Sequence, residues 1–284
     1  MPTGFALDTD QGFSASDELR VVTLARDLGY DSAWTNTGPN AEAFERCLRW
    51  HTATGLPVGI SAVPASGQPP AFYLEHTRRL WDATGGKFTL VVGSGQLQHP
   101  AREMPAYLAD IRAGLPDGAP LYVAALGPLM LRLAGEVADG VALNWCSARQ
   151  VAWSRQILRE SAQRAGRDVP RVIEYIRTAV DPDAELARAT VAKAAARYTH
   201  YPGYRQHFER MGVVDELERV ERDDALPTAE LVSQVGAAGV PGQTRASFEQ
   251  LAGGLDLPIV RVLVTRSGDI ESARRVLEEC KPRS

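Results

Sequence analysis

The sequence is poor in cysteine, has no excess of basic residues and contains no long apolar run. Its three cysteines, Cys47, Cys146 and Cys280, are odd in number and widely spaced. Such a set fits reduced thiols better than a disulfide framework, and no metal-ligand spacing accompanies it. The cysteines therefore argue against a small disulfide-stabilised scaffold and against a structural metal site.

The charge balance and the short apolar runs exclude further classes of protein. Lys and Arg number 31 against 35 Asp and Glu, a formal charge of -4, whereas nucleic-acid binders usually carry a basic face. Runs such as 121–131 fall short of the roughly 20 apolar residues of a membrane helix. Asp8 and Asp10 interrupt the region where a signal peptide needs an apolar core. We therefore expect a cytoplasmic protein that binds neither nucleic acid nor membrane.

What the sequence does contain is an alternation of apolar and helical segments. Hydrophobic residues make up 44% and charged residues 23% of the chain, as in globular proteins with a substantial core. The segments that predict strands are 4–8, 32–36, 57–63, 88–92, 121–126, 140–145, 171–180 and 259–265. Several are apolar almost throughout, which is typical of parallel strands buried on both faces. Helical segments lie between them, such as the one that opens with Ser16 as N-cap and ends at Gly29.

Eight such units predict an α/β fold, a TIM-like (β/α)8 barrel. The alternative, a doubly wound open sheet, usually has fewer strands and a glycine fingerprint after its first strand, which is missing here. The interval of about 181–258 is too long for a bare loop and reads as helices, the first capped at Asp181 with Pro182 following. We therefore predict a single domain, residues 1–284, with a helical insertion between strands seven and eight.

Two strand ends draw attention because active sites of parallel barrels lie at the carboxyl ends of the strands. At Gly127-Pro128 the glycine permits a close backbone approach and the proline suits a first helical position. The N–H groups of Leu129 and Met130 would then face outward at a helix N-terminus without nearby acids, which suits a phosphate. The glycines of 93–96 permit a flat ring to lie near the backbone. The alternative for both segments is an ordinary tight turn.

With these strand ends identified, the sequence resembles the luciferase-like monooxygenase superfamily, in particular its coenzyme F420-dependent oxidoreductases. The segments that carry the resemblance are "LARDLGYDSAWTNT", "TATGLPVGISAVPAS", "TRRLWDATGGKFTLVVGSGQ", "LYVAALGPLMLRLAGEVADGVALNW" and "RYTHYPGYRQHFERMG". They occur in the family's order over about 250 residues. The resemblance implies hydride transfer between bound F420 and a small organic substrate, in a homodimer. An FMN-dependent monooxygenase that uses O2, or a non-redox ligand-binding member, is the alternative.

The resemblance also implies cofactor contacts at three strand ends. Ser61 and Ala62 correspond to a bulge, often with a non-proline cis peptide bond, that supports the ring of the cofactor. Gly93, Ser94 and Gly95 correspond to residues beside the ring and the ribityl chain. The phosphate would be received by Gly127, Pro128, Leu129 and Met130, the same loop that the physical argument selects.

One departure from the family leaves the acid–base group unassigned. Many F420-dependent dehydrogenases carry an Asp-His pair after strand two, where this chain has Thr37-Gly38. We expect Asn36, Thr37 and Asn144 to contact the substrate and His99 to be the candidate substitute for the missing histidine. The tyrosines Tyr198, Tyr201 and Tyr204 would form an aromatic wall or simply pack within the insertion.

Overall fold

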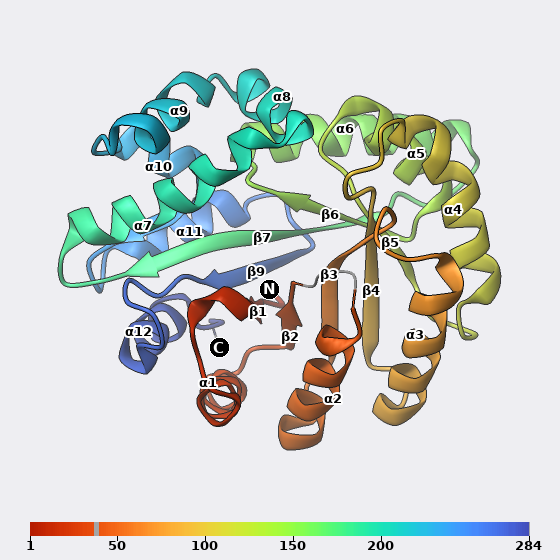
Figure 1. Ribbon diagram of the computed structural model, residues 1–284, viewed down its shortest axis with the longest axis horizontal. Helices are drawn as coiled ribbons and strands as arrows, with labels where there is room; N and C mark the ends of the chain where they lie inside the picture. The colour runs from red at the N-terminus through yellow and green to blue at the C-terminus, as the bar shows by residue number, and fades with distance from the viewer. Residues whose placement is uncertain (37–39, 284) are drawn as a thin grey trace.

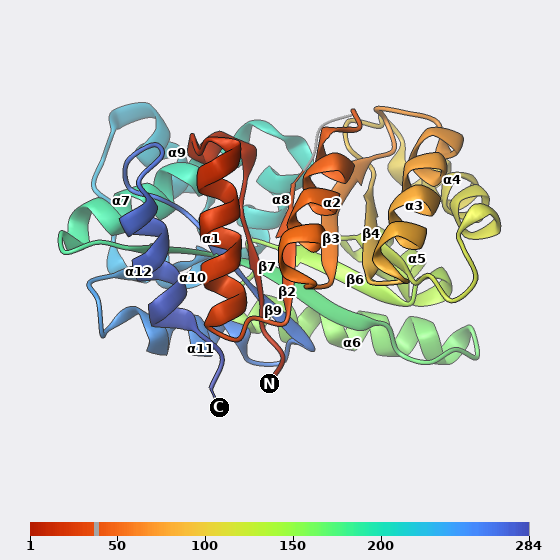
Figure 2. The ribbon, with the colours of Figure 1, turned by 90° about the horizontal axis from the view of Figure 1, so that it is seen from below.

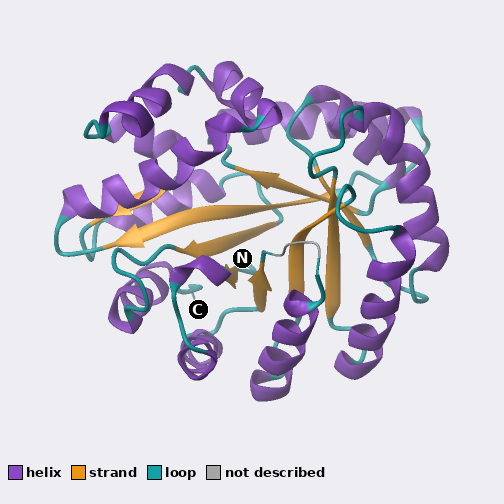
Figure 3. Cartoon of the chain, in the orientation of Figure 1, coloured by secondary structure: helices purple, strands orange, loops and turns teal. Residues whose placement is uncertain are grey.

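The computed structural model describes residues 1–36 and 40–283 and contains a closed barrel of parallel strands (Figure 1 and Figure 3). The strands are β1 (Gly4–Ala6), β2 (Ser32–Thr35), β3 (Val58–Pro64), β4 (Phe88–Gly93), β5 (Leu121–Ala124), β6 (Gly140–Asn144), β7 (Arg171–Val180), β8 (Ala237–Gly239) and β9 (Leu257–Val262). Strands β1 to β6 pair in sequence, β9 pairs with β1 and β7, and β7 pairs with β6. These pairings close eight strands into the predicted barrel, while β8 adds to the end of β7.

A layer of helices surrounds the strands, as the view from below shows (Figure 2). It consists of α1 (Ala15–Asp27), α2 (Glu42–Thr54), α3 (Pro70–Thr84), α4 (Pro100–Gly114), α5 (Pro128–Val137), α6 (Ala148–Arg164), α11 (Thr244–Ala252) and α12 (Ile270–Cys280), with the short η1 (Thr9–Gln11) after β1. The predicted N-cap Ser16 of α1 is wrong by two residues: the side chain of Ser14 accepts the N–H of Asp17. Since none of the described helices is both long and apolar enough, none could cross a bilayer.

The segment after β7 forms the predicted helical insertion and has a core of its own. It contains α7 (Ala184–Ala196), η2 (Arg197–His200), α8 (Pro202–Met211), α9 (Val214–Asp223) and α10 (Ala229–Val235). Asp183, rather than the predicted Asp181, caps α7 by accepting the N–H groups of Glu185 and Leu186. The cluster that joins Phe208 and Leu217 also includes Trp145, at the end of β6. The insertion therefore packs on the carboxyl end of the barrel.

The predicted interval 181–258 holds more than these helices. β8, α11 and the first residues of β9 also lie within it. β8 consists of alanine and glycine only, which do not favour a strand. α11 packs against β7, α6 and α12 as part of the outer layer. That the whole chain is one domain stays a prediction.

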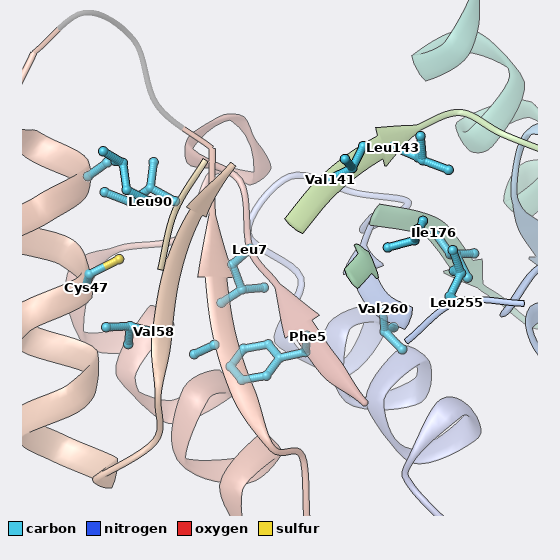
Figure 4. Packing of buried hydrophobic residues seen from close by; sticks show 14 of the residues in the cluster. Phe5, Leu7, Cys47, Val58, Leu90, Val141, Leu143, Ile176, Leu255 and Val260 are labelled. Atoms are coloured by element: carbon cyan, nitrogen blue, oxygen red, sulfur yellow. The ribbon is translucent and has the colours of Figure 1, made fainter. Parts of the chain in front are cut away.

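Two apolar layers hold the barrel together. Between strands and helices lie residues such as Phe5, Leu90 and Ile176, which Figure 4 shows packed between the elements. Inside the barrel a separate cluster includes Trp34, Tyr122 and Tyr175. Large rings fit there because glycines face two of them. A Cβ added at Gly59 would lie 2.3 Å from the Trp34 ring, and one added at Gly140 would lie 2.3 Å from the Tyr122 ring.

We predict that Gly140→Ala destabilises the barrel, because the buried Tyr122 ring has to shift to admit the methyl group. Overpacking of this kind costs about 1–3 kcal/mol. The matched control is Gly203→Ala in α8, where an added Cβ meets nothing within 4 Å and alanine is favoured over glycine in a helix by about 0.5–1 kcal/mol. Chemical denaturation measures the free energy of unfolding of both variants. Equal stability of the two variants would contradict the packing argument.

A buried carboxyl group links β7 to the end of β6. Glu174 is 2% exposed, and its Oε1 accepts the N–H of Cys146 at 2.6 Å. Burial raises the pKa of Glu174 from 4.5 to about 8, although this hydrogen bond and the charge of Arg177 oppose the rise. The folded protein therefore holds a proton on Glu174 at pH values where the unfolded chain has released it.

From this we predict a stability that falls as the pH rises. The contribution of the proton on Glu174 is complete below about pH 4.5 and is lost as the pH rises through about 8. Glu174→Gln keeps a neutral side chain of the same shape and should remove this part of the pH dependence. Urea denaturation of both proteins at pH 5 and pH 8 measures it. Parallel profiles for the two proteins would show that Glu174 is not the titrating group.

Candidate active site

The carboxyl end of the barrel presents one inward-facing residue from each strand. Side chains alternate between the two faces of a strand, so on seven of the barrel strands the position two residues beyond the interior cluster also faces inward. On β3, where the register shifts, Ala62 itself packs against that cluster. We call this set the mouth layer. Its members are Asp8, Asn36, Ala62, Gly93, Ala124, Asn144, Arg177 and Arg261. Three adjacent strands, β3 to β5, supply only alanine and glycine, and the other five supply polar or charged side chains. The mouth is therefore divided into a small half and a polar half.

The small half is nearly free of side chains. A Cβ built on Gly93 would lie 3.4 Å from the Cβ atoms of both Ala62 and Ala124, so these three residues lie side by side. The peptide bond between Ser61 and Ala62 is cis, and the register of β3 against β4 shifts between Ser61 and Val63. This is the backbone geometry that the family resemblance implied. Such a surface leaves room for a flat ring.

Next to the small half, α5 begins with an open N-terminus. Gly127 is its N-cap and offers no side-chain hydrogen bond, and its first turn contains no acid. A Cβ at Gly127 would meet nothing within 4 Å, and Leu129 is 59% exposed. Arg210 of the insertion donates Nη2–H to the carbonyl of Leu126 at 3.1 Å, so a positive charge lies at the same loop. The free N–H groups of the first turn and this charge both suit an anion.

His99 lies on the side of the mouth where α4 and α5 begin. It is exposed, it is the N-cap residue of α4, and its backbone N–H donates to Glu103. Together with Arg102 and Leu129 it lines a shallow hollow of about 370 Å³. His99 therefore lies beside the predicted phosphate loop, and it makes no hydrogen bond with the described residues of the polar half.

The polar half contains a buried ion pair at its base. Arg261 donates Nε–H to Oδ2 of Asp8 at 2.6 Å, and both side chains are less than 10% exposed. The guanidinium carbon of Arg261 lies 4.8 Å from the ring centroid of Tyr175. The hydroxyl of Tyr175 donates to the carbonyl of Thr35. These contacts fix the Arg261 side chain inside the barrel.

Arg177 is a second buried guanidinium, and the described residues include no carboxylate in hydrogen-bond contact with it. It is 2% exposed, and its guanidinium carbon lies 3.8 Å from the Trp145 ring centroid. Trp145 has a left-handed backbone, φ 57°, which is uncommon for a bulky residue. Nη1 of Arg177 donates to Oδ1 of Asn144. Burial, which has the larger effect, and the charge of Arg261 together lower the pKa of Arg177 to about 10.

The insertion covers the polar half with tyrosines. Nδ2 of Asn144 donates to the hydroxyl of Tyr204 at 2.7 Å. The Tyr204 ring lies 4.7 Å from that of Tyr198, centroid to centroid, and Tyr198 in turn lies 5.5 Å from Trp145. Tyr198 and Tyr204 thus cover the polar half of the mouth, and the exposed Tyr201 packs against both of them from outside.

Several polar atoms of the mouth are buried without a partner among the described residues. They are Oδ1 of Asp8, Oδ1 of Asn36, Nε1 of Trp145 and Nη2 of Arg177. Buried polar atoms are nearly always hydrogen-bonded, so these four atoms suit a polar ligand at the mouth. Further unpaired atoms, such as Nε1 of Trp50 and Oγ of Ser154, lie elsewhere in the described chain. Thr37, the other predicted substrate contact after β2, lies outside the described residues.

Sequence reasoning missed three members of the polar half, Asp8, Arg177 and Arg261. It also missed two residues that contact this half, Trp145 and, as the partner of Asn144, Tyr204. A signal for two of them was present. The segments 171–180 and 259–265 are apolar strands interrupted by arginines. A charged side chain inside a buried strand needs a partner or a function. Their positions two residues beyond inward-facing apolar residues would have assigned both arginines to the mouth.

Comparison with known proteins agrees with this geometry. The family model described as luciferase-like monooxygenase matches residues 109–255. The F420-dependent glucose-6-phosphate dehydrogenase of Mycolicibacterium fortuitum is 30% identical over 84% of this chain and 85% of its own length. Two solved structures share the fold with a TM-score of 0.74 over 98% of both chains. They are the coenzyme F420-dependent tetrahydromethanopterin reductase of Methanopyrus kandleri, 18% identical, and an F420-dependent secondary alcohol dehydrogenase, 15% identical.

The family match and the relative in Mycolicibacterium fortuitum each cover more than half of the chain. The matched range runs from α4 into the turn before β9 and so includes α5, Asn144, Arg177 and the insertion. The backbone geometry at Ser61 and Ala62, outside that range, is the one the family resemblance implied. The chain belongs to the luciferase-like monooxygenase family, whose members include its F420-dependent relatives.

Proposed function

We propose that this protein is an F420-dependent oxidoreductase that transfers a hydride between the deazaflavin and a small organic substrate. The observation that carries the proposal is the small half of the mouth lying next to the uncapped N-terminus of α5. The first suits a flat ring and the second a phosphate, which are the two parts of such a cofactor. The relatives named F420-dependent support the choice of cofactor.

The proposed cofactor contacts lie at these two places, the small half of the mouth and the start of α5. Ser61, Ala62 and Gly93 would support the ring, Ser94 and Gly95 would adjoin its side chain, and Gly127, Pro128, Leu129 and Met130 would bind the phosphate. A bound deazaflavin supplies the hydride chemistry. The protein orients the reactants and excludes water, since the tyrosines of the insertion lie above the polar half.

The proposed substrate side is the polar half. The free oxygen of Asn36 and the second N–H of Asn144 are available for hydrogen bonds there, and Thr37 remains a proposed contact. His99, exposed beside Leu129, is proposed to act where ligands enter. The homodimer and the cytoplasmic location also stay predictions.

Titration of the purified protein with F420 and with FMN, each followed by cofactor fluorescence, tests the proposal. We expect saturable binding of F420 at micromolar concentration and weaker binding of FMN. Tighter binding of FMN would favour the flavin-dependent monooxygenase. Binding of neither cofactor would favour a ligand-binding protein without redox activity.

We predict that Leu129→Asp weakens F420 binding about tenfold, which corresponds to about 1.4 kcal/mol, because the new carboxylate repels the phosphate. Leu129 is 59% exposed, so little packing is lost. An acid in the first helical turn stabilises the helix by about 0.3–1 kcal/mol. Affinity and stability should therefore change in opposite directions, as fluorescence titration and thermal denaturation measure.

The matched control for this variant is Leu226→Asp. Leu226 is 69% exposed and lies between α9 and α10, so Leu226→Asp introduces the same charge away from α5. Its F420 affinity should equal that of the unmodified protein. Unchanged F420 affinity in a folded Leu129→Asp variant would show that the phosphate binds elsewhere.

A further inference from the structure

A hydrogen-bond chain of fixed direction runs through the polar half of the mouth. Arg177 has only N–H donors, so the group that it binds on Asn144 must be the acceptor oxygen Oδ1. The other end of the amide, Nδ2, is then a donor, and it lies 2.7 Å from the hydroxyl oxygen of Tyr204. The Tyr204 oxygen therefore accepts, and its own proton must point to another group.

The Tyr204 hydroxyl is held over the mouth from two sides. Asn144 fixes the oxygen from the end of β6, and the ring packs against Tyr198, Tyr201 and Phe208 at centroid distances of 4.7, 6.4 and 6.4 Å. Among the described residues, the Tyr204 hydroxyl makes no hydrogen bond besides the one that it accepts from Asn144. The geometry thus presents one oriented O–H donor on the side of the mouth proposed for the substrate.

The charges around this hydroxyl suit a proton donor. Burial raises the pKa of Tyr204 to about 12, so the phenol is neutral at pH 7. The groups whose charges reach it are Tyr198, Arg177 and Arg261. The Asn144 hydrogen bond and the two arginines oppose the rise, because they stabilise a phenolate. Tyr204 therefore holds its proton at rest and has donors and cations ready for the negative charge that remains after proton transfer.

We propose that Tyr204 is the acid–base residue of the enzyme, with Asn144 and Arg177 as positioning residues, and that the substrate is a carbonyl compound or the corresponding alcohol. This inference rests on the proposed function. In reduction, the carbonyl carbon receives a hydride from the reduced deazaflavin and the π bond to oxygen breaks. The carbonyl oxygen takes the Tyr204 proton, and the phenolate regains a proton from water. Oxidation of the alcohol follows the same steps in reverse.

This role fits the departure from the family pattern after β2. The Asp-His pair that the family resemblance led us to look for after β2 is absent, since the chain has Thr37-Gly38 there, and His99 lies beside Leu129. The insertion, which supplies Tyr204, comes from a different part of the chain. The proton would thus be delivered from above the barrel rather than from the loop after β2.

Asn144→Asp tests the direction of the hydrogen-bond chain. An aspartate still accepts from Arg177 and gives its charge a partner, so thermal stability should be unchanged or higher. It cannot donate to Tyr204 and would instead accept the Tyr204 proton. We expect the pKa of Tyr204, read from the ¹³Cζ resonance of labelled tyrosine, to rise. Turnover should fall by about 100-fold or more, within the range for loss of an acid–base group. An unchanged pKa and turnover would overturn the proposal.

Tyr204→Phe provides the second test, because it keeps the packed ring, removes the hydroxyl and assigns the Tyr204 resonance. The matched control is Tyr201→Phe in the same cluster, where the side chain is 45% exposed. With reduced F420 and a panel of acetone, cyclohexanone and benzaldehyde, we expect turnover in the unmodified protein and in Tyr201→Phe. Turnover of Tyr204→Phe should fall about 100-fold or more, with F420 affinity unchanged.

The outcomes separate this inference from the proposed function. Absence of F420 binding to the unmodified protein would contradict the proposed function. The resonance of Tyr204 in Asn144→Asp instead tests the direction of the hydrogen-bond chain, and this measurement needs no cofactor. If F420 binds and no member of the panel reacts, the carbonyl class of substrate is wrong. If the panel reacts equally well with Tyr204→Phe, Tyr204 is not the proton donor.

Discussion

The pairing of β7 with β6 on one side and β9 on the other determines which side chains face the inside of the barrel. With Ile173 and Tyr175 inside, Arg177 must also be inside, and Glu174 must lie outside, where it binds the backbone of Cys146. A shift of one residue would exchange these sets. The same strand therefore both closes the barrel and supplies a charge to its mouth, so the mouth cannot form before the barrel has closed in this register.

The two halves of the mouth reflect different uses of side-chain volume. On the small half, Ala62, Gly93 and Ala124 leave the backbone open to a flat ligand. On the polar half, two guanidinium groups and an amide are enclosed by aromatic rings. A buried arginine without a carboxylate partner is unfavourable for stability, so the polar half indicates selection for binding or catalysis rather than for folding.

The sequence predicted what depends on local pattern. Eight of the nine strands lie in apolar or alternating runs between turn residues, and the number and spacing of these runs led to the barrel. The start of α5 could be predicted because Gly127 and Pro128 act locally. The polar half could not, because Asn144, Arg177 and Tyr204 belong to three separate segments, and the contact between them depends on the closed barrel and on the docking of the insertion. β8 was missed because Ala237–Gly239 contains only alanine and glycine, which are depleted in strands.

The long connection from Val180 to Leu257 has a consequence for how the chain folds. β9 completes the barrel by pairing with both β1 and β7, so the strands at the two ends of this connection must pair before the ring of strands is complete. The entropy of closing a flexible loop grows only slowly with its length, by about 0.6 kcal/mol for each doubling. Helices α7 to α10 have a core of their own. When they form early, they reduce the length of flexible chain that has to be closed. The segment that supplies Tyr204 can therefore grow or change in sequence during evolution at small cost to barrel assembly, which makes it a suitable place to vary the substrate.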